Sequence, residues 1–88
     1  FRRIDVSYEE SQRTNLDKKI SSAIPATLGG LALESYDRRD GVRFNLAGGS
    51  WGVVRMSGTE PLIRIYAETP DDKTLEAVLA DLRSIMGV

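Results

Sequence analysis

Polar and apolar residues alternate along several short segments from Leu31 onward. A period of two is typical of strands that bury one face. The turn-forming pairs Asp40-Gly41 and Gly48-Gly49 separate these segments, and short connections of this kind join antiparallel neighbours. We therefore predict antiparallel strands at Leu31–Tyr36, Val42–Leu46, Trp51–Met56 and Leu62–Glu68.

A helical spacing precedes the strands, with apolar residues on one face at Leu16, Ile20, Ala23 and Ile24. This spacing predicts a first helix from about Gln12 or Thr14 to Ile24. Thr14 and Asp17 have the separation of a capping box at its start. Pro25 is expected to end the helix, because proline cannot continue it.

The chain closes with a second helical pattern, whose apolar stripe consists of Leu75, Val78, Leu79, Leu82, Ile85 and Met86. We expect Thr69 to cap this helix, Pro70 to take its first position and Asp72 to complete a capping box. Gly87 suits its end. With two helices beside antiparallel strands, the predicted fold class is α+β: a sheet of about four strands with both helices packed on one face.

The first residues are ambiguous. Ile4 and Val6 alternate with Arg3 and Asp5, which fits either an edge strand or the end of a linker from a preceding domain. We therefore expect residues 1–11 to be such a linker or edge strand and residues 12–88 to be one domain. The chain begins at Phe1 rather than Met, and we expect it to be cut from a longer protein.

Composition removes several function classes. The 88 residues include neither histidine nor cysteine, which excludes Ser–His and Cys–His nucleophilic pairs and an ordinary zinc site. No apolar run approaches the roughly 20 residues of a membrane span. Absence of cysteine is compatible with a reducing cytoplasm, where we expect the protein to act.

The formal net charge of −1 is unevenly distributed. Residues 37–66 carry five arginines against three acidic residues (+2), and residues 67–88 carry two basic against five acidic residues (−3). The middle of the chain is thus suited to anions. A nucleic-acid-binding module has a broader basic excess, so we expect no nucleic-acid partner and no membrane.

The richest run of polar chemistry lies at 55–64. Arg55 ends a predicted strand, and Ser57, Gly58 and Thr59 follow in a loop before Pro61. Guanidinium forks, hydroxyls and close-approaching backbone are the groups that hold phosphate esters. We expect Gly58 to adopt a positive φ and so point successive amides inward. The alternative is a plain hairpin turn, in which Glu60 pairs with Arg55 or Arg64 and nothing binds.

Other polar features have simpler interpretations. Arg38-Arg39 is expected to be a solvated basic pair, and Asp71-Asp72 to be helix-capping charges. Trp51 and Tyr66 are expected to pack on the sheet. Ser57 has no base that would make it a nucleophile, so we assign no catalytic and no metal-binding residue.

Three motifs together resemble the C-terminal domain of the α-D-phosphohexomutases, a family that includes phosphoglucomutases, phosphomannomutases and phosphoglucosamine mutases. They are Asp40–Phe44, Gly49–Trp51 and RMSGTEPLIRIYAE at residues 55–68. Met56 departs from the proline that the family usually has after the arginine. Its side chain is expected to face away from Arg55, which changes the stiffness of the loop rather than its binding.

The resemblance implies a fold like half of a TATA-box-binding protein, and an isomerase that needs further domains. In such enzymes a phosphoserine on another domain, with Mg²⁺ bound there, transfers its phosphoryl group to a hexose phosphate, and the bisphosphorylated intermediate then reorients. The C-terminal domain holds the phosphate that is not reacting. By this resemblance the phosphate ligands are Arg55, Ser57, Gly58 and Thr59, with Glu60 and Arg64 supporting the loop.

The implied partners are hexose phosphates, hexose bisphosphates and the preceding domains of the same chain, and the isolated fragment is expected to be inactive. Three alternatives stay open. One is a phosphoglucosamine mutase domain. The others are a non-enzymatic nucleic-acid-binding module, which needs exposed paired aromatics, and an interaction module in which the loop is a mere turn.

Overall fold

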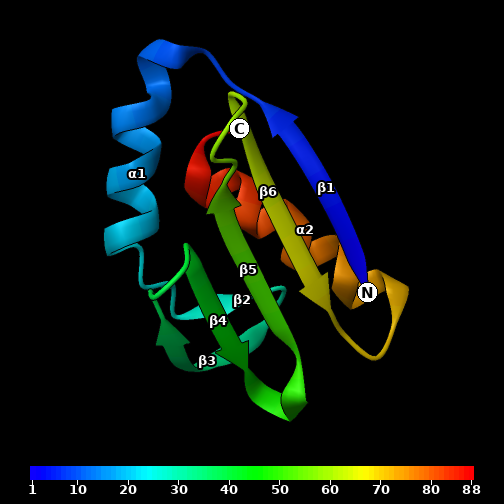
Figure 1. Ribbon diagram of the computed structural model, residues 1–88. Coiled ribbons are helices and arrows are strands. Elements are labelled where there is room, and N and C mark those ends of the chain that lie inside the picture. Colours follow the sequence, from blue (N-terminus) through cyan, green and yellow to red (C-terminus); the bar gives the residue numbers. More distant parts are fainter.

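The computed structural model describes residues 1–88 and contains a six-stranded antiparallel sheet (Figure 1). The order of the strands across the sheet is β1-β6-β5-β4-β3-β2. The strands are β1 (Arg2–Ser7), β2 (Thr27–Leu28), β3 (Leu31–Asp37), β4 (Val42–Leu46), β5 (Trp51–Met56) and β6 (Leu62–Glu68). The α+β class and the strands expected from alternation are confirmed.

The expected count of about four strands is wrong, because a strand at each end of the sheet adds to it. β1 pairs with β6, with Ile4 opposite Ile65. β2 pairs with β3, with Leu28 opposite Leu31. A two-residue strand is too short to show any alternation, and Ile4 and Val6 alone did not distinguish a paired strand from a linker.

The two faces of the sheet differ in character. Side chains that point to the helices are fully or almost fully buried: Val42, Phe44, Leu46, Val54, Ile63, Ile65 and Ala67. Because successive residues of a strand point to opposite faces, the residues between them lie on the other face, which no helix covers. Arg43, Arg55 and Arg64 are on this open face.

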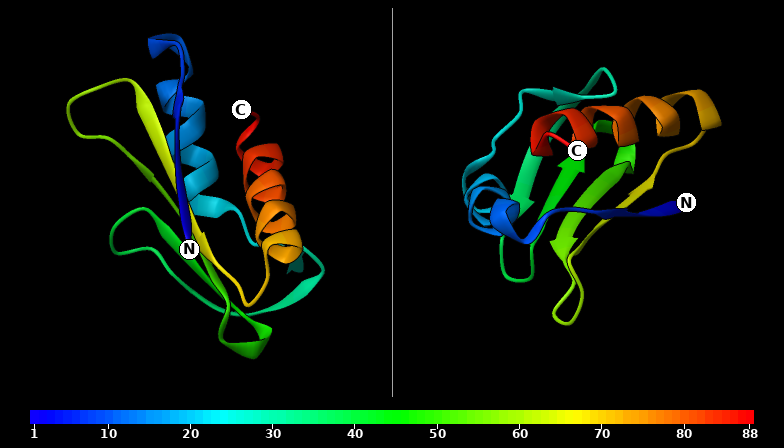
Figure 2. Two further views of the ribbon diagram at one scale, coloured as in Figure 1. Left: turned by 90° about the vertical axis from the view of Figure 1, so that its right-hand side faces the viewer. Right: turned by 90° about the horizontal axis from the view of Figure 1, so that it is seen from above.

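Both helices lie on the same side of the sheet (Figure 2), as expected. They are α1 (Arg13–Ser22), which follows a 3₁₀ turn at Glu10–Gln12, and α2 (Asp72–Met86). Leu16 and Ile20 of α1 join the stripe of α2 in one core. α2 lies so close to β5 that a methyl group on Gly52 would meet Leu82 Cδ1 at 2.9 Å. None of the helices is long and apolar enough to cross a membrane.

The start and the end of α1 differ from the prediction. The capping box forms one turn earlier, where Glu9 and Gln12 satisfy each other's backbone amides around the 3₁₀ turn, so the expected box of Thr14 and Asp17 is wrong. The helix ends at Ser22 rather than Ile24. Pro25 disfavours helical geometry at the residue before it, and Ile24 is 61% exposed instead of joining the core.

α2 begins two residues later than expected. Asp71 is the N-cap, and its side chain accepts a hydrogen bond from the amide of Thr74 at 2.7 Å. Thr69 instead donates its hydroxyl to the carbonyl of Asp71, so the expected cap at Thr69 and the first helical position of Pro70 are wrong. Asp72 occupies that first position. Gly87 ends the helix with φ +76°, as predicted.

Candidate functional site

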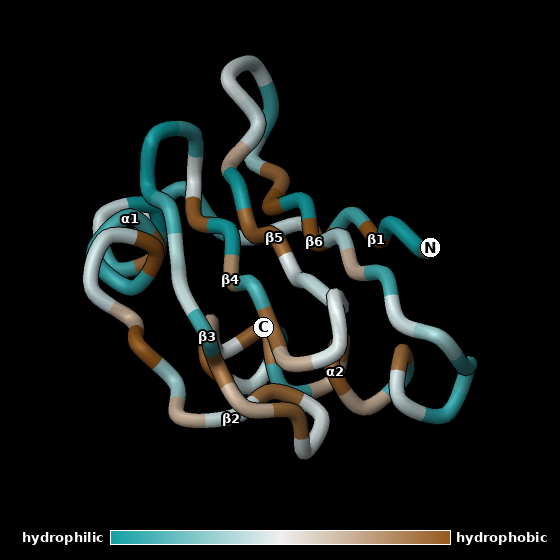
Figure 3. Tube along the Cα trace, turned by 90° about the horizontal axis from the view of Figure 1, so that it is seen from below, coloured by the Kyte–Doolittle hydropathy of each residue, from teal (hydrophilic) through white to brown (hydrophobic).

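The loop between β5 and β6 is held at its base by backbone hydrogen bonds. The amide of Ser57 donates to the carbonyl of Leu62 at 2.9 Å, and the amide of Tyr8 donates to the carbonyl of Pro61 at 3.0 Å. Figure 3 shows that the loop extends beyond the sheet and that its residues are of intermediate to hydrophilic character. The loop is therefore fixed at both ends while its tip stays outside the core.

Inside the loop, the hydroxyl oxygen of Ser57 accepts hydrogen bonds from two backbone amides. Its Oγ accepts from the amides of Thr59 and Glu60, each at 3.4 Å, and the Ser57 side chain is buried. Two long hydrogen bonds to one oxygen are weak, so these donors are available for a stronger acceptor. Amides that converge in this way suit an anion.

Gly58 contributes space rather than an unusual backbone angle. It is not among the glycines with positive φ, so the expected left-handed conformation there is wrong in this structure. A methyl group built on Gly58 would meet no atom within 4 Å. The backbone is thus open on this side, which permits a ligand to approach it closely.

Arg55 and Arg64 lie directly opposite each other on β5 and β6. Like charges in such a cross-strand pair are destabilising. The Nε atoms of both arginines are shielded from solvent and have no hydrogen-bond partner. Two arginines at opposed strand positions, each with an unsatisfied Nε donor, form a site where an anion would be stabilising.

Acidic side chains neutralise this pair only in part. Asp40 forms an ion pair with Arg55, from Nη1 to Oδ2 at 3.3 Å. Asp5 lies opposite Arg64 in the β1–β6 register, yet it pairs with Arg3 at 3.7 Å. No ion pair joins Glu60 to Arg55 or Arg64, so the ion pairs of the plain hairpin alternative are absent.

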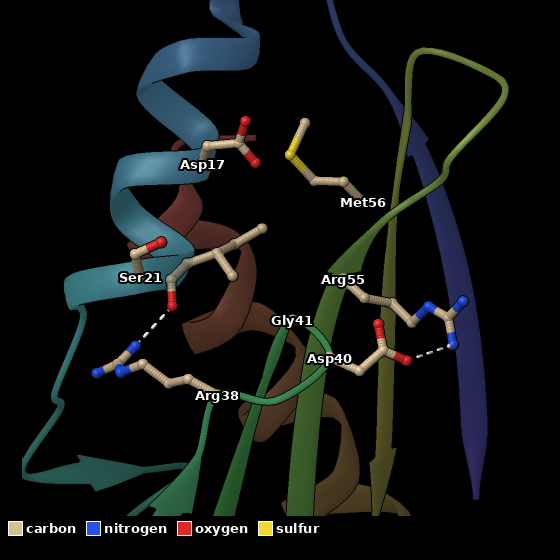
Figure 4. Close-up of a pocket in the computed structure, with 8 residues that line it drawn as sticks. Asp17, Ser21, Arg38, Asp40, Gly41, Arg55 and Met56 are labelled. Atoms are coloured by element: carbon tan, nitrogen blue, oxygen red, sulfur yellow. Dashed lines mark hydrogen bonds and ion pairs between the residues drawn. The ribbon is translucent and has the colours of Figure 1, made fainter.

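Two depressions meet at Arg55. One has a volume of about 250 Å³ on the open face, lined by Asp40, Arg43, Trp51, Val53, Arg55 and Tyr66. The other has about 360 Å³ and lies between α1 and the β3–β4 turn (Figure 4). Met56 points into this second depression, towards Asp17, while the side chain of Arg55 points the other way. Met56 therefore faces away from Arg55, as predicted.

The two arginines of the β3–β4 turn have separate structural roles. Arg38 donates to the carbonyls of Ile20 and Ala23 at 2.5 and 2.6 Å and so caps the end of α1. The expectation of a solvated pair is wrong for Arg38. Arg39 is 91% exposed and binds Asp37, and this hydrogen bonding lowers the pKa of Asp37 from 3.8 to about 2.

Aromatic side chains cluster on the open face away from the loop. The ring of Phe1 lies 5.9 Å from that of Trp51 and 6.3 Å from that of Tyr66, between centroids. Arg43 lies over Trp51 at 4.6 Å. Trp51 and Tyr66 thus pack on the sheet, as expected, and they do so on its uncovered side.

Residues 8–85 match the family model of the phosphoglucomutase/phosphomannomutase C-terminal domain. The chain belongs to this family. A phosphoglucosamine mutase of Moorella thermoacetica is 38% identical over 69 residues, which are 78% of this chain and 14% of that protein. A phosphopentomutase of Thermococcus kodakarensis is 40% identical over 58 residues, 66% of this chain and 11% of that protein.

A second phosphoglucosamine mutase, from Syntrophomonas wolfei, is 51% identical over 37 residues, 40% of this chain and 8% of that protein. The chain thus spans 8–14% of the length of these curated relatives. The family resemblance of the sequence motifs is confirmed.

Sequence reasoning placed Arg55 correctly on its strand and missed Asp40 as its partner. The β4–β5 register pairs Val42 with Val54, which places the Asp40-Gly41 turn next to Arg55. The structure places Arg55 and Arg64 opposite each other on β5 and β6, and the amides of Thr59 and Glu60 converge on Ser57 in the loop that follows Arg55.

Proposed function

We propose that this chain is the C-terminal, substrate-phosphate-binding domain of a phosphohexomutase. Such an enzyme interconverts hexose 1-phosphate and hexose 6-phosphate through a phosphoserine and a bisphosphorylated sugar. The observation that carries the proposal is the opposed pair of arginines, Arg55 and Arg64, which Asp40 neutralises only in part. It lies beside a loop whose amides converge on one serine oxygen.

The proposed ligands of the phosphate are Arg55, the hydroxyls of Ser57 and Thr59, and the open backbone at Gly58. Glu60 supports the loop through its backbone, since its carbonyl accepts from the amide of Leu62 at 2.7 Å. We expected Arg64 to support the loop as well. Its position opposite Arg55, with no ion-pair partner, favours a direct share in holding the anion.

A phosphate holder suits a reaction in which the sugar must bind in two orientations. The constant feature at the far end of either orientation is a tetrahedral dianion, and arginine forks recognise it without reading the sugar. Binding energy from this non-reacting group positions the reacting end. The domain therefore assists phosphoryl transfer without taking part in its bond changes.

Catalysis itself is assigned to preceding domains of a longer cytoplasmic enzyme. The Mg²⁺ of the reaction is proposed to be held by one of those domains; this chain contains no group of three or more carboxylate, histidine or cysteine side chains that could hold a metal ion. We propose that the isolated chain is inactive and that its fold is the half of a TATA-box-binding protein implied by the family. Because relatives are named phosphoglucosamine mutase and phosphopentomutase, a phosphorylated amino sugar or a pentose phosphate is an alternative substrate for the proposed enzyme.

Replacing Arg55 with alanine in the full-length enzyme tests the proposal. Loss of charge-assisted hydrogen bonds weakens transition-state binding by about 1.5–3 kcal/mol, so kcat/KM should fall roughly 10- to 150-fold. Arg39→Ala is the matched control, because it removes the same charge from an exposed side chain whose guanidinium is engaged by Asp37. An Arg55→Ala enzyme with the kcat/KM of the Arg39→Ala control would refute the assignment.

A further inference from the structure

The β3–β4 turn lies directly against the backbone of Arg55. Gly41 has φ +69°, and a methyl group on it would meet the carbonyl oxygen of Val54 at 2.3 Å and Cα of Arg55 at 2.9 Å. Only a residue without a side chain permits this approach. The turn is therefore built to hold the preceding residue, Asp40, beside Arg55.

The ion pair that results is a loose one. Its N–O distance of 3.3 Å joins side chains that are 42% and 78% exposed, and the pair does not have the geometry of a hydrogen bond. The neighbouring Arg39 binds Asp37 differently, through hydrogen bonds from Nε at 2.9 Å and from Nη2 at 2.5 Å. Exposed pairs with poor geometry are weak, so a better anion can displace the carboxylate of Asp40.

Asp40 is the anion that would compete with an entering phosphate for Arg55. Among the residues that line the open-face depression, Arg43 and Arg55 are basic and Asp40 is the acidic one. Arg64 adds a further positive charge opposite Arg55. A phosphate dianion that entered would meet attraction from the arginines and repulsion from Asp40, the carboxylate that pairs with Arg55. Asp5, which lies opposite Arg64, pairs with Arg3 instead.

We propose that Asp40 is an exchange partner for Arg55: it pairs with the guanidinium while the site is empty and is displaced when a phosphate binds. The inference rests on the proposed function. In a reaction whose intermediate must reorient, the phosphate has to leave Arg55 within each turnover. Asp40 lowers the affinity for phosphate and gives Arg55 a partner as the phosphate departs.

The sign of a substitution distinguishes exchange from support. If Asp40 only held Arg55 in position, Asp40→Asn would weaken phosphate binding. An exchange partner predicts the opposite: Asp40→Asn should lower the Kd for inorganic phosphate about two- to fivefold, the range expected for an exposed ion pair. Asp40→Ser is a second variant, which removes the same charge with a different side chain.

The measurement is a titration of the 88-residue chain with inorganic phosphate at constant ionic strength, followed by the amide NMR signals of residues 55–60. Glu34→Gln is the charge-matched control, since Glu34 is exposed and forms no ion pair. We expect wild type and Glu34→Gln to bind equally, Arg55→Ala to lose binding, and both Asp40 variants to bind more tightly.

The outcomes separate the two proposals. If the wild-type chain shows no shifts with phosphate, or Arg55→Ala binds as well as wild type, the proposed function fails and the exchange role fails with it. If wild type binds through Arg55 and the Asp40 variants bind equally or more weakly, the exchange role alone is refuted. If Glu34→Gln also binds phosphate more tightly, the tighter binding of the Asp40 variants is explained by net charge alone, and the exchange role is refuted.

Discussion

Replacing Gly41 with alanine should displace the turn that lies against Arg55. The new methyl group would stand 2.3 Å from the carbonyl oxygen of Val54 and 2.7 Å from Cβ of Arg55, both on β5. Neither neighbour is the end of a flexible side chain, so the turn itself has to move. Asp40 would move with it and leave the guanidinium of Arg55.

Two separate contributions determine how much stability Gly41→Ala loses. A side chain at the left-handed φ of Gly41 costs about 1–2 kcal/mol. Relief of the overlap costs about 1–3 kcal/mol more. Together they should lower the free energy of unfolding by about 2–5 kcal/mol. This is a large fraction of the roughly 4–13 kcal/mol of unfolding free energy expected for a chain of 88 residues.

Gly48→Ala isolates the contribution of the close contact. Gly48 also has a positive φ, +78°, but a methyl group there would meet no atom within 4 Å. This control should therefore lose only the backbone contribution of about 1–2 kcal/mol. Urea unfolding followed by far-UV circular dichroism gives both values. Equal losses in Gly41→Ala and Gly48→Ala would refute the close packing of the turn on β5.

Two further predictions concern stability. Asp71→Ala should lower the melting temperature by several degrees, because it removes the N-cap of α2; an unchanged thermal transition would contradict that role. The depressed pKa of Asp37, about 2 against an ordinary 3.8, means that its pairing with Arg39 stabilises the fold above about pH 4 and that this contribution is lost as the pH falls towards 2. Asp37→Asn should therefore reduce the urea midpoint at about pH 6 and leave it nearly unchanged at about pH 2, and an equal deficit at both pH values would count against the pairing.

The parts of the fold that the sequence predicted are those where burial imposes a period. β4, β5 and β6 alternate because one face meets α2, and the stripe of α2 repeats because the helix lies on that face. The capping positions were misplaced because several polar residues near each start compete for the same role. At α2 the carboxylate of Asp71 reaches the amide of Thr74, and the hydroxyl of Thr69 is used elsewhere.

The candidate site was predicted as a list of residues and not as an arrangement. Composition and alternation indicated Arg55 and the loop hydroxyls. The cross-strand pairing of Arg55 with Arg64 depends on how many residues the loop inserts between β5 and β6. The approach of Asp40 depends on Gly41 contacting a third strand. Arg38, which caps α1 across the depression, was missed because its partners are backbone carbonyls far along the chain.

The central claim, that the loop holds the phosphate of a phosphosugar, is tested most directly by an NMR titration of the chain with glucose 6-phosphate and, separately, with glucose. We predict amide shifts confined to residues 55–60 and to Arg64 with the phosphosugar, at an affinity no better than roughly millimolar, and none with glucose. Equal shifts with both sugars would contradict the claim. The claim would also be contradicted if a short RNA shifted the amide signals of Trp51 and Tyr66 while the loop signals did not change with the phosphosugar.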